Sequence, residues 1–179
     1  MTESIIDKSP VFAVRAQITV KASVDEVYAV VSDLPRSREW SPECTGGEWI
    51  SGEPATVGAV FRGENLRADD VVGWAPLVRG VWYTQARITA AEPGRTFRWA
   101  MLTHVGENQQ SVWGFDIEPA AEGSVLTHHF RMDRPTEGIY KIVADMDEEQ
   151  RRRFFREWSE KLEQDVARTL ESLKAVIES

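Results

Sequence analysis

The C-terminal end of the chain carries the pattern that most constrains its fold. In residues 148–179, large apolar residues recur at steps of three or four with charged residues between them. This is the spacing of one apolar face of an α-helix. At about 1.5 Å per residue, such a helix is long enough to cross a whole domain of this size. The face consists of Phe154, Trp158, Leu162, Val166, Leu170, Leu173 and Ile177.

The rest of the chain is dominated by strand patterns. Residues 12–20 alternate between apolar and polar side chains, which predicts a half-buried strand. Six further segments have strand character, and short Gly- and Pro-containing turns separate several of them, which favours hairpins and an antiparallel sheet. These segments are 47–51, 59–67, 81–91, 96–101, 109–118 and 124–132.

Two short helices are expected after the first strand. Ser23 and Glu26 have the spacing of a capping box, and apolar residues at helical spacing follow. A second helical segment begins at Pro35 and ends before Pro42. The element order predicts an α+β fold, in which a curved antiparallel sheet wraps around the long C-terminal helix. A cavity is expected where the two surfaces diverge.

The length of 179 residues fits one domain, and no repeat or Ser/Gly/Pro-rich linker divides the chain. We expect a flexible N-terminus at residues 1–10 and a single domain at residues 11–179. Residues 68–80 show no clear period and form either a long loop or an insertion. We expect the apolar residues 71–77 of this segment to be exposed, where they can serve as a lid or in a homodimer.

Charge and cysteine content narrow the range of partners. The net charge of −8 argues against nucleic acid and anionic membranes as main partners, because both favour a basic face. Cys44 is the only cysteine, which excludes an internal disulfide and a zinc site built from several thiolates. We expect no metal, no cofactor and a cytoplasmic location. No run approaches the roughly 18 apolar residues of a membrane span, so stable membrane insertion is not expected.

The inward faces of the predicted strands are rich in aromatic residues and hold few polar groups, as small-molecule sites do. Seven tryptophans in one small chain add to this composition. Two interpretations stay open: the residues line a cavity for a small hydrophobic molecule, or they fill a solid core. The candidate ligand-binding residues are Phe61, Asn65, Trp82, Trp99, Ser111, Trp113, His128 and Phe130 on strands, and Phe154, Trp158 and Leu162 on the helix.

The adjacent residues His128 and His129 point to opposite faces of one predicted strand, so they cannot share a metal or relay a proton. His128 shares its face with Phe130 and is the better pocket candidate. An imidazole there can act as an acid or base near neutral pH, or it can be hydrogen-bonded within the sheet. The sequence contains no nucleophile elbow, phosphate loop or zinc-protease motif. Whether the protein is an enzyme therefore stays open.

Three segments resemble the START-like (SRPBCC) superfamily, in particular its polyketide cyclase/dehydrase-like members. They are Ile18-Thr19-Val20-Lys21-Ala22-Ser23-Val24-Asp25-Glu26-Val27-Tyr28, then Asp33-Leu34-Pro35 through Glu39-Trp40-Ser41-Pro42, and Val57-Gly58-Ala59-Val60-Phe61-Arg62-Gly63-Glu64-Asn65. The resemblance runs over nearly the whole chain, from about residue 11 to 177. It implies the helix-grip fold and adds Trp40 to the candidate ligand-binding residues.

The resemblance also implies a function. Relatives of this kind bind polyketide-, lipid- or sterol-like molecules in the internal cavity, and some catalyse cyclisation and dehydration of a folded chain by positioning it. By this analogy His128 and Asn65, together with Ser111, would polarise a carbonyl group or shuttle a proton. Other branches imply two alternatives: a protein-interaction module resembling the activators of chaperone ATPases, or a lipid or quinone carrier.

Overall fold

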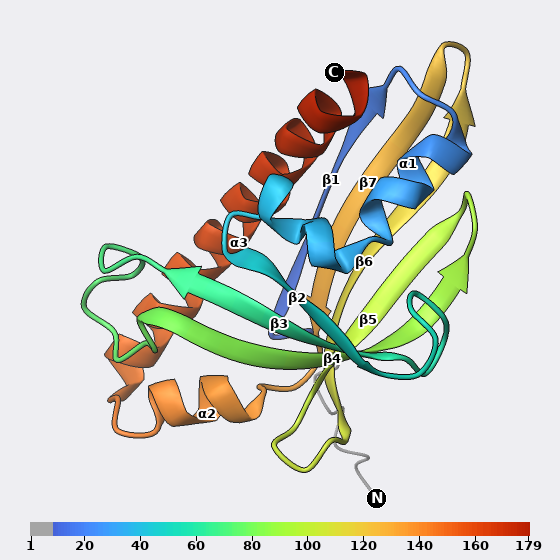
Figure 1. Cartoon of the computed structure of the whole chain (residues 1–179). Coiled ribbons are helices and arrows are strands. Elements are labelled where there is room, and N and C mark those ends of the chain that lie inside the picture. Colours follow the sequence, from blue (N-terminus) through green and yellow to red (C-terminus); the bar gives the residue numbers. More distant parts are fainter. Residues whose placement is uncertain (1–8) are drawn as a thin grey trace, which may run out of the picture.

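The computed structural model describes residues 9–179, so most of the expected flexible N-terminus lies outside the described residues. Within them, seven strands form one antiparallel sheet in the order β1-β7-β6-β5-β4-β3-β2. The sheet curves around the long helix α3 (Glu148–Glu178), as Figure 1 shows. The predicted α+β helix-grip fold is confirmed. The strands are β1 (Phe12–Val20), β2 (Cys44–Ser51), β3 (Val60–Arg67), β4 (Gly80–Glu92), β5 (Thr96–Leu102), β6 (Asn108–Ala120) and β7 (Gly123–Met132).

Side-chain caps fix where the helices begin. Helix α1 (Val24–Val31) begins with the predicted capping box: the Ser23 hydroxyl accepts from the Glu26 amide, and the Glu26 carboxylate accepts from the Ser23 amide. Asp147 and Gln150 make the same reciprocal pair at the start of α3. Each box satisfies two backbone N–H groups that have no partner within the helix.

Two elements differ from the sequence prediction: an additional short helix and an earlier start of β2. A short helix, α2 (Glu137–Val143), lies between β7 and α3; its two turns are too short to show a helical period in the sequence. Strand β2 begins at Cys44, three residues earlier than predicted, and a bulge separates Cys44 from Gly46 in its pairing with β3. The second short helix is the 3₁₀-helix η1 (Leu34–Glu39).

The strand register decides which side chains face α3. On β6, Trp113 pairs with Phe130 of β7 and with Trp99 of β5. On β3, Asn65 pairs with Trp82 of β4. The inward set expected from alternation therefore lies on one face of the sheet, with no one-residue slip. The buried apolar residues of this interior form two clusters, one toward α1 and one toward α2.

Gly123 in the β6–β7 turn packs closely against the neighbouring backbone. Gly123 has φ +135°, and a Cβ added there would lie 2.1 Å from the Val20 carbonyl oxygen. We expect Gly123→Ala to lower the free energy of unfolding by more than about 2 kcal/mol, measured by urea denaturation. Gly106→Ala is the matched control, because Gly106 also has a positive φ but open space around its Cα; a loss of only about 1 kcal/mol is expected there. Equal losses would contradict the packing argument.

Candidate functional site

The interior between the sheet and α3 gathers the predicted site residues. Phe61 and Phe130 are buried on the sheet, while Phe154, Trp158 and Leu162 are buried on α3. The remaining strand tryptophans of the set are half-buried. Side chains from distant parts of the sequence thus form one aromatic interior, which is the arrangement that a hydrophobic ligand needs.

His128 lies between the two apolar clusters. Its ring stacks on Phe115 with the centroids 4.2 Å apart, and on Trp113 at 5.6 Å. Phe115 belongs to the cluster toward α1, and Trp113 packs on the cluster toward α2. The Nδ1 of His128 lies 2.8 Å from the Gly114 carbonyl oxygen. Since a carbonyl only accepts, Nδ1 carries the proton and Nε2 keeps its lone pair.

Burial lowers the pKa of His128 to about 4, because an imidazolium ion loses its hydration there. The hydrogen bond to Gly114 opposes this shift, and the neighbouring His129 adds to it. The ring is therefore neutral at pH 7. In this state it can accept a hydrogen bond through Nε2, but it is a weak base.

Asn65 lies far from His128 along the sheet. Strands β6, β5 and β4 separate the two residues, and neighbouring strands are about 4.8 Å apart. The side-chain amide of Asn65 already donates toward the Thr84 hydroxyl at 3.2 Å and the Trp82 carbonyl at 3.4 Å. Three strands therefore separate the two residues along the sheet, and the roles that the resemblance implies for them stay a prediction.

Two tryptophans hold buried indole N–H groups without an acceptor among residues 9–179, namely Trp40 and Trp82. Trp40 is 5 % exposed, and its ring meets Phe115 edge-on at 5.7 Å. Trp82 lies on β4, where it pairs with Asn65 of β3. A buried donor without an acceptor costs roughly 1–3 kcal/mol. These two groups are therefore available to an acceptor carried by a ligand.

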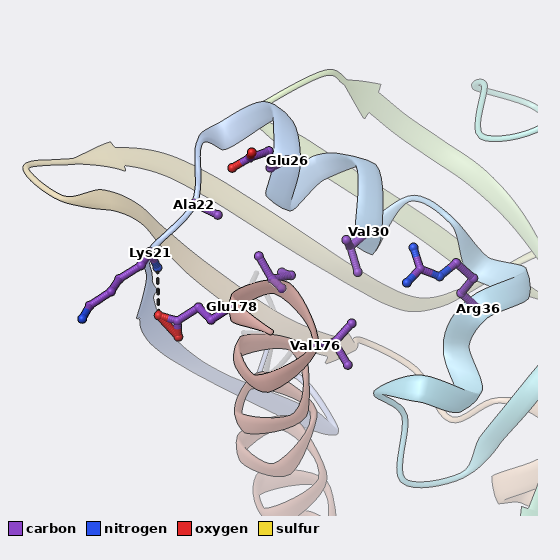
Figure 2. A pocket seen from close by; sticks show the side chains of 8 residues that line it. Lys21, Ala22, Glu26, Val30, Arg36, Val176 and Glu178 are labelled. Atoms are coloured by element: carbon purple, nitrogen blue, oxygen red, sulfur yellow. Dashed lines mark hydrogen bonds between the residues drawn. The ribbon is translucent and has the colours of Figure 1, made fainter.

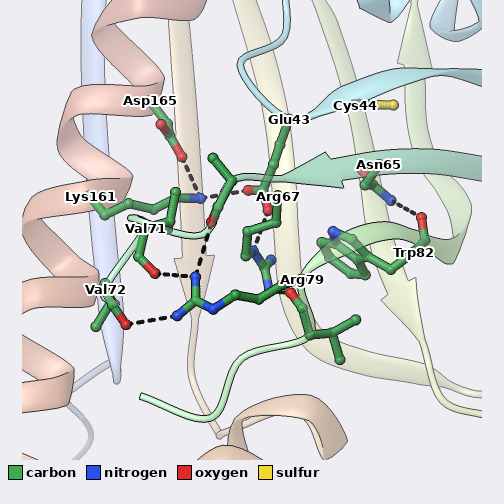
Figure 3. Close-up of polar contacts among 12 residues, drawn as sticks. Glu43, Cys44, Asn65, Arg67, Val71, Val72, Arg79, Trp82, Lys161 and Asp165 are labelled. Carbon is green, nitrogen blue, oxygen red and sulfur yellow. Dashed lines mark hydrogen bonds and ion pairs between the residues drawn. The ribbon is translucent and has the colours of Figure 1, made fainter. Parts of the chain in front are cut away.

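The interior also holds a cluster of charged side chains that the sequence analysis missed (Figure 3). Glu43 binds Arg67 through one carboxylate oxygen and Lys161 through the other, at 2.6 Å from Lys161 Nζ. Lys161 also pairs with Asp165 at 2.7 Å. Burial raises the pKa of Asp165, and the neighbouring Lys161 opposes that shift. We call these four residues the ion cluster.

Residues 68–80, which we call the lid only as a label, pack against the helices. Ala75 and Leu77 are buried in the same cluster as Phe154 and Trp158. The expectation that the apolar residues of this segment are exposed is therefore wrong for Ala75 and Leu77, which are buried in a cluster with residues of α2 and α3. The indole N–H of Trp74 donates to Glu157 on α3 at 2.7 Å.

Arg79 holds the lid in its shape (Figure 3). Its guanidinium donates to the backbone carbonyls of Ala68, Val71, Val72 and Ala75 at 2.7 to 3.2 Å. Val72 has φ +43°, which is unfavourable for a β-branched residue. The four hydrogen bonds lie within the loop and compensate this strain, while Trp74 makes the contact to α3.

The two described hollows lie outside this interior. The larger, about 430 Å³, lies between the ends of α1 and α3 and has a mixed charged rim of Lys21, Glu26, Arg36 and Glu178 (Figure 2). The smaller, about 190 Å³, lies on the outer face of β2, β3 and β4, beside Tyr83. No candidate ligand-binding residue lines either hollow.

Comparison with known proteins agrees with this architecture. Residues 11–178 match the family described as polyketide cyclase / dehydrase and lipid transport. The chain belongs to this family. Among the curated proteins, none matches the chain. No helix within residues 9–179 has the length and apolarity to cross a membrane.

Several solved structures have a similar fold. The polyketide-cyclase-like protein Cgl2372 of Corynebacterium glutamicum is 25 % identical, with a TM-score of 0.64 over 95 % of this chain and 93 % of that one. The di-domain ARO/CYC protein BexL of the BE-7585A pathway has a TM-score of 0.66 at 16 % identity over 94 % of this chain. StfQ of the steffimycin pathway has a TM-score of 0.63 at 15 % identity over 93 %. The chain spans 50 % of each di-domain protein.

Removing the Arg79 guanidinium should loosen the lid. In Arg79→Gln, we expect backbone amides of residues 68–79 to exchange hydrogen at least roughly tenfold faster, because four carbonyls lose their donor. Arg87→Gln is the matched control, since Arg87 donates to Gly106 and Asn108 in another loop. That variant should speed exchange only in the β5–β6 loop. Unchanged exchange at residues 68–79 in Arg79→Gln would show that the lid is held by its apolar contacts alone.

The low pKa of His128 predicts how stability depends on pH. An unfolded histidine binds a proton near pH 6.5, whereas the folded one does so near pH 4. The contribution of neutral His128 to the free energy of unfolding is therefore complete above pH 6.5. It is lost as the pH falls toward 4, and the total loss is on the order of 3 kcal/mol. His128→Gln should flatten the fall of unfolding free energy between pH 6.5 and 4, measured by urea denaturation. His129→Gln should flatten it less, because His129 is less buried and pairs with Asp116. An equal slope in wild type and His128→Gln would contradict the shift.

Proposed function

We propose that the protein binds a small hydrophobic ligand, of polyketide-, lipid- or sterol-like chemistry, between the concave face of the sheet and α3. Family membership supports a ligand-binding or cyclase-like function in general terms. The structure adds the aromatic interior, where Phe130, Trp113 and Trp99 stand side by side on three neighbouring strands.

The observation that carries this proposal is the pair of buried indole N–H groups on Trp40 and Trp82. A solid core would gain stability from phenylalanine at both positions, because phenylalanine has no donor to satisfy. A ligand with oxygen acceptors would satisfy these donors while its apolar body contacts the aromatic walls.

Catalysis of cyclisation and dehydration is the finer part of the proposal. The role that suits His128 is acceptance of a hydrogen bond from a ligand hydroxyl or enol through Nε2, since a pKa of about 4 makes it a weak base. Positioning of a folded chain against the aromatic walls would then supply most of the rate enhancement.

A second candidate function is a protein-interaction module, which one feature favours. Leu66 and Val81 form an exposed cross-strand pair on the outer face of the sheet, with the exposed side chains of Val78 and Tyr83 on the adjoining segments. Exposed apolar patches often mark interaction sites. A partner protein or a second copy of the chain would use this face rather than the interior.

Ligand content separates the two candidates. We expect native mass spectrometry of protein purified from its own host, followed by organic extraction, to find one apolar small molecule per chain. We also expect the tryptophan fluorescence of the stripped protein to be quenched by the extracted compound, and the compound can then be tested for turnover. Protein that is empty, and whose fluorescence no member of a panel of apolar ligands quenches, would contradict ligand binding and favour the interaction module.

A further inference from the structure

Arg67 lies between the sheet and α3, next to two aromatic rings. It occupies the last inward position of β3 and is 7 % exposed. Its guanidinium lies 4.4 Å from the ring centre of Trp82 on the sheet and 5.2 Å from that of Trp158 on α3. Stacking of this kind fixes the plane of the guanidinium and keeps water away from its faces.

The donors of Arg67 are only partly used. Its Nε donates to Glu43 and its Nη1 to the Val78 carbonyl at 3.3 Å. Among the described residues, Nη2 has no acceptor, and the adjacent Trp82 indole N–H has none either. Two donors without acceptors thus belong to side chains that stack on each other, and the Trp82 indole N–H is the buried one of the two.

The charges around Arg67 decide what kind of acceptor fits. The ion cluster pairs two cations, Arg67 and Lys161, with two carboxylates, Glu43 and Asp165. Its formal charge is zero. An added carboxylate would leave one buried negative charge without a partner, which is costly. A neutral carbonyl oxygen accepts hydrogen bonds without disturbing this balance.

The part of the interior toward α1 has a different composition. There Phe97 and Phe115 are completely buried, and Trp99 packs on both. The ion cluster thus lies beside Trp82 and Trp158, whereas the residues toward α1 are aromatic. A ligand with an apolar body and an oxygen at one end would therefore bind in one orientation.

We propose that Arg67 and Trp82 form a carbonyl-binding subsite, which orients a ligand with a neutral ketone under the lid and its apolar body toward α1. This proposal rests on the proposed ligand-binding function. The two donors bind the ketone oxygen, and the balanced ion cluster selects against acids.

Three small naphthalene ligands test this subsite by isothermal titration calorimetry. They are 2-acetylnaphthalene, its hydrocarbon counterpart 2-isopropylnaphthalene, and the acid 2-naphthoate. Wild-type protein should bind the ketone roughly tenfold more tightly than the hydrocarbon and more tightly than the acid. Trp82→Phe should reduce this preference, taken as the ratio of ketone affinity to hydrocarbon affinity within the variant, to less than roughly threefold.

Two further variants act as controls. Trp40→Phe removes the other unpaired indole N–H, in the cluster toward α1, and should keep the preference for the ketone. Glu43→Gln leaves the ion cluster with one uncompensated cation and should strengthen binding of 2-naphthoate at least roughly fivefold. Melting curves confirm that each variant is folded.

The outcomes separate the subsite from the function. Wild-type protein that binds ketone and hydrocarbon equally, or loses its preference in Trp40→Phe but keeps it in Trp82→Phe, would overturn the subsite and leave ligand binding intact. Naphthoate binding that does not change in Glu43→Gln would overturn the charge argument. If none of the three ligands binds, the proposed function itself is contradicted.

Discussion

Contact between the apolar face of α3 and the concave face of the sheet is the interaction on which the other features depend. Phe154, Leu162 and Leu173 are buried by it, and burial of each such side chain contributes about 1.5–3 kcal/mol. One helix is too narrow to fill a curved sheet of seven strands. The helix packs on β1, at one edge of the sheet, so the other edge requires additional groups to close the interior.

The ion cluster and the lid provide that closure. Glu43, just before β2, reaches Arg67 at the end of β3 and Lys161 on α3. Buried charges are costly when they are alone, but a fully paired group can hold two surfaces at a defined distance. The lid then covers the gap with Ala75 and Leu77.

Much of this fold could be predicted from local sequence patterns. A period of 3.6 identified the face of α3, a period of two identified the inward side chains of the strands, and the Ser23–Glu26 spacing identified a helix start. The same period of two also places Arg67 inward, since it follows Phe61, Gly63 and Asn65 at alternate positions of β3. That signal was present in the sequence, but an arginine at a strand end is usually solvated.

Other features depend on contacts between distant residues. Glu43 and Lys161 are 118 positions apart, and no periodicity shows that they meet. The short helix α2 and the packing of Leu77 likewise depend on the tertiary structure. The sequence placed His128 and Asn65 correctly on inward faces, but only the strand order shows that three strands separate them. Whether the candidate residues bind a ligand stays a prediction.

The most direct test of ligand binding in the cleft is a nuclear magnetic resonance titration of the indole N–H signals of the seven tryptophans. Substitution of single tryptophans assigns the signals, and 2-acetylnaphthalene is the titrant. Binding between the sheet and α3 predicts that the Trp82 signal moves downfield and that its proton exchanges more slowly with water. Trp82 and Trp40 signals that stay unchanged at saturating ligand would contradict the account.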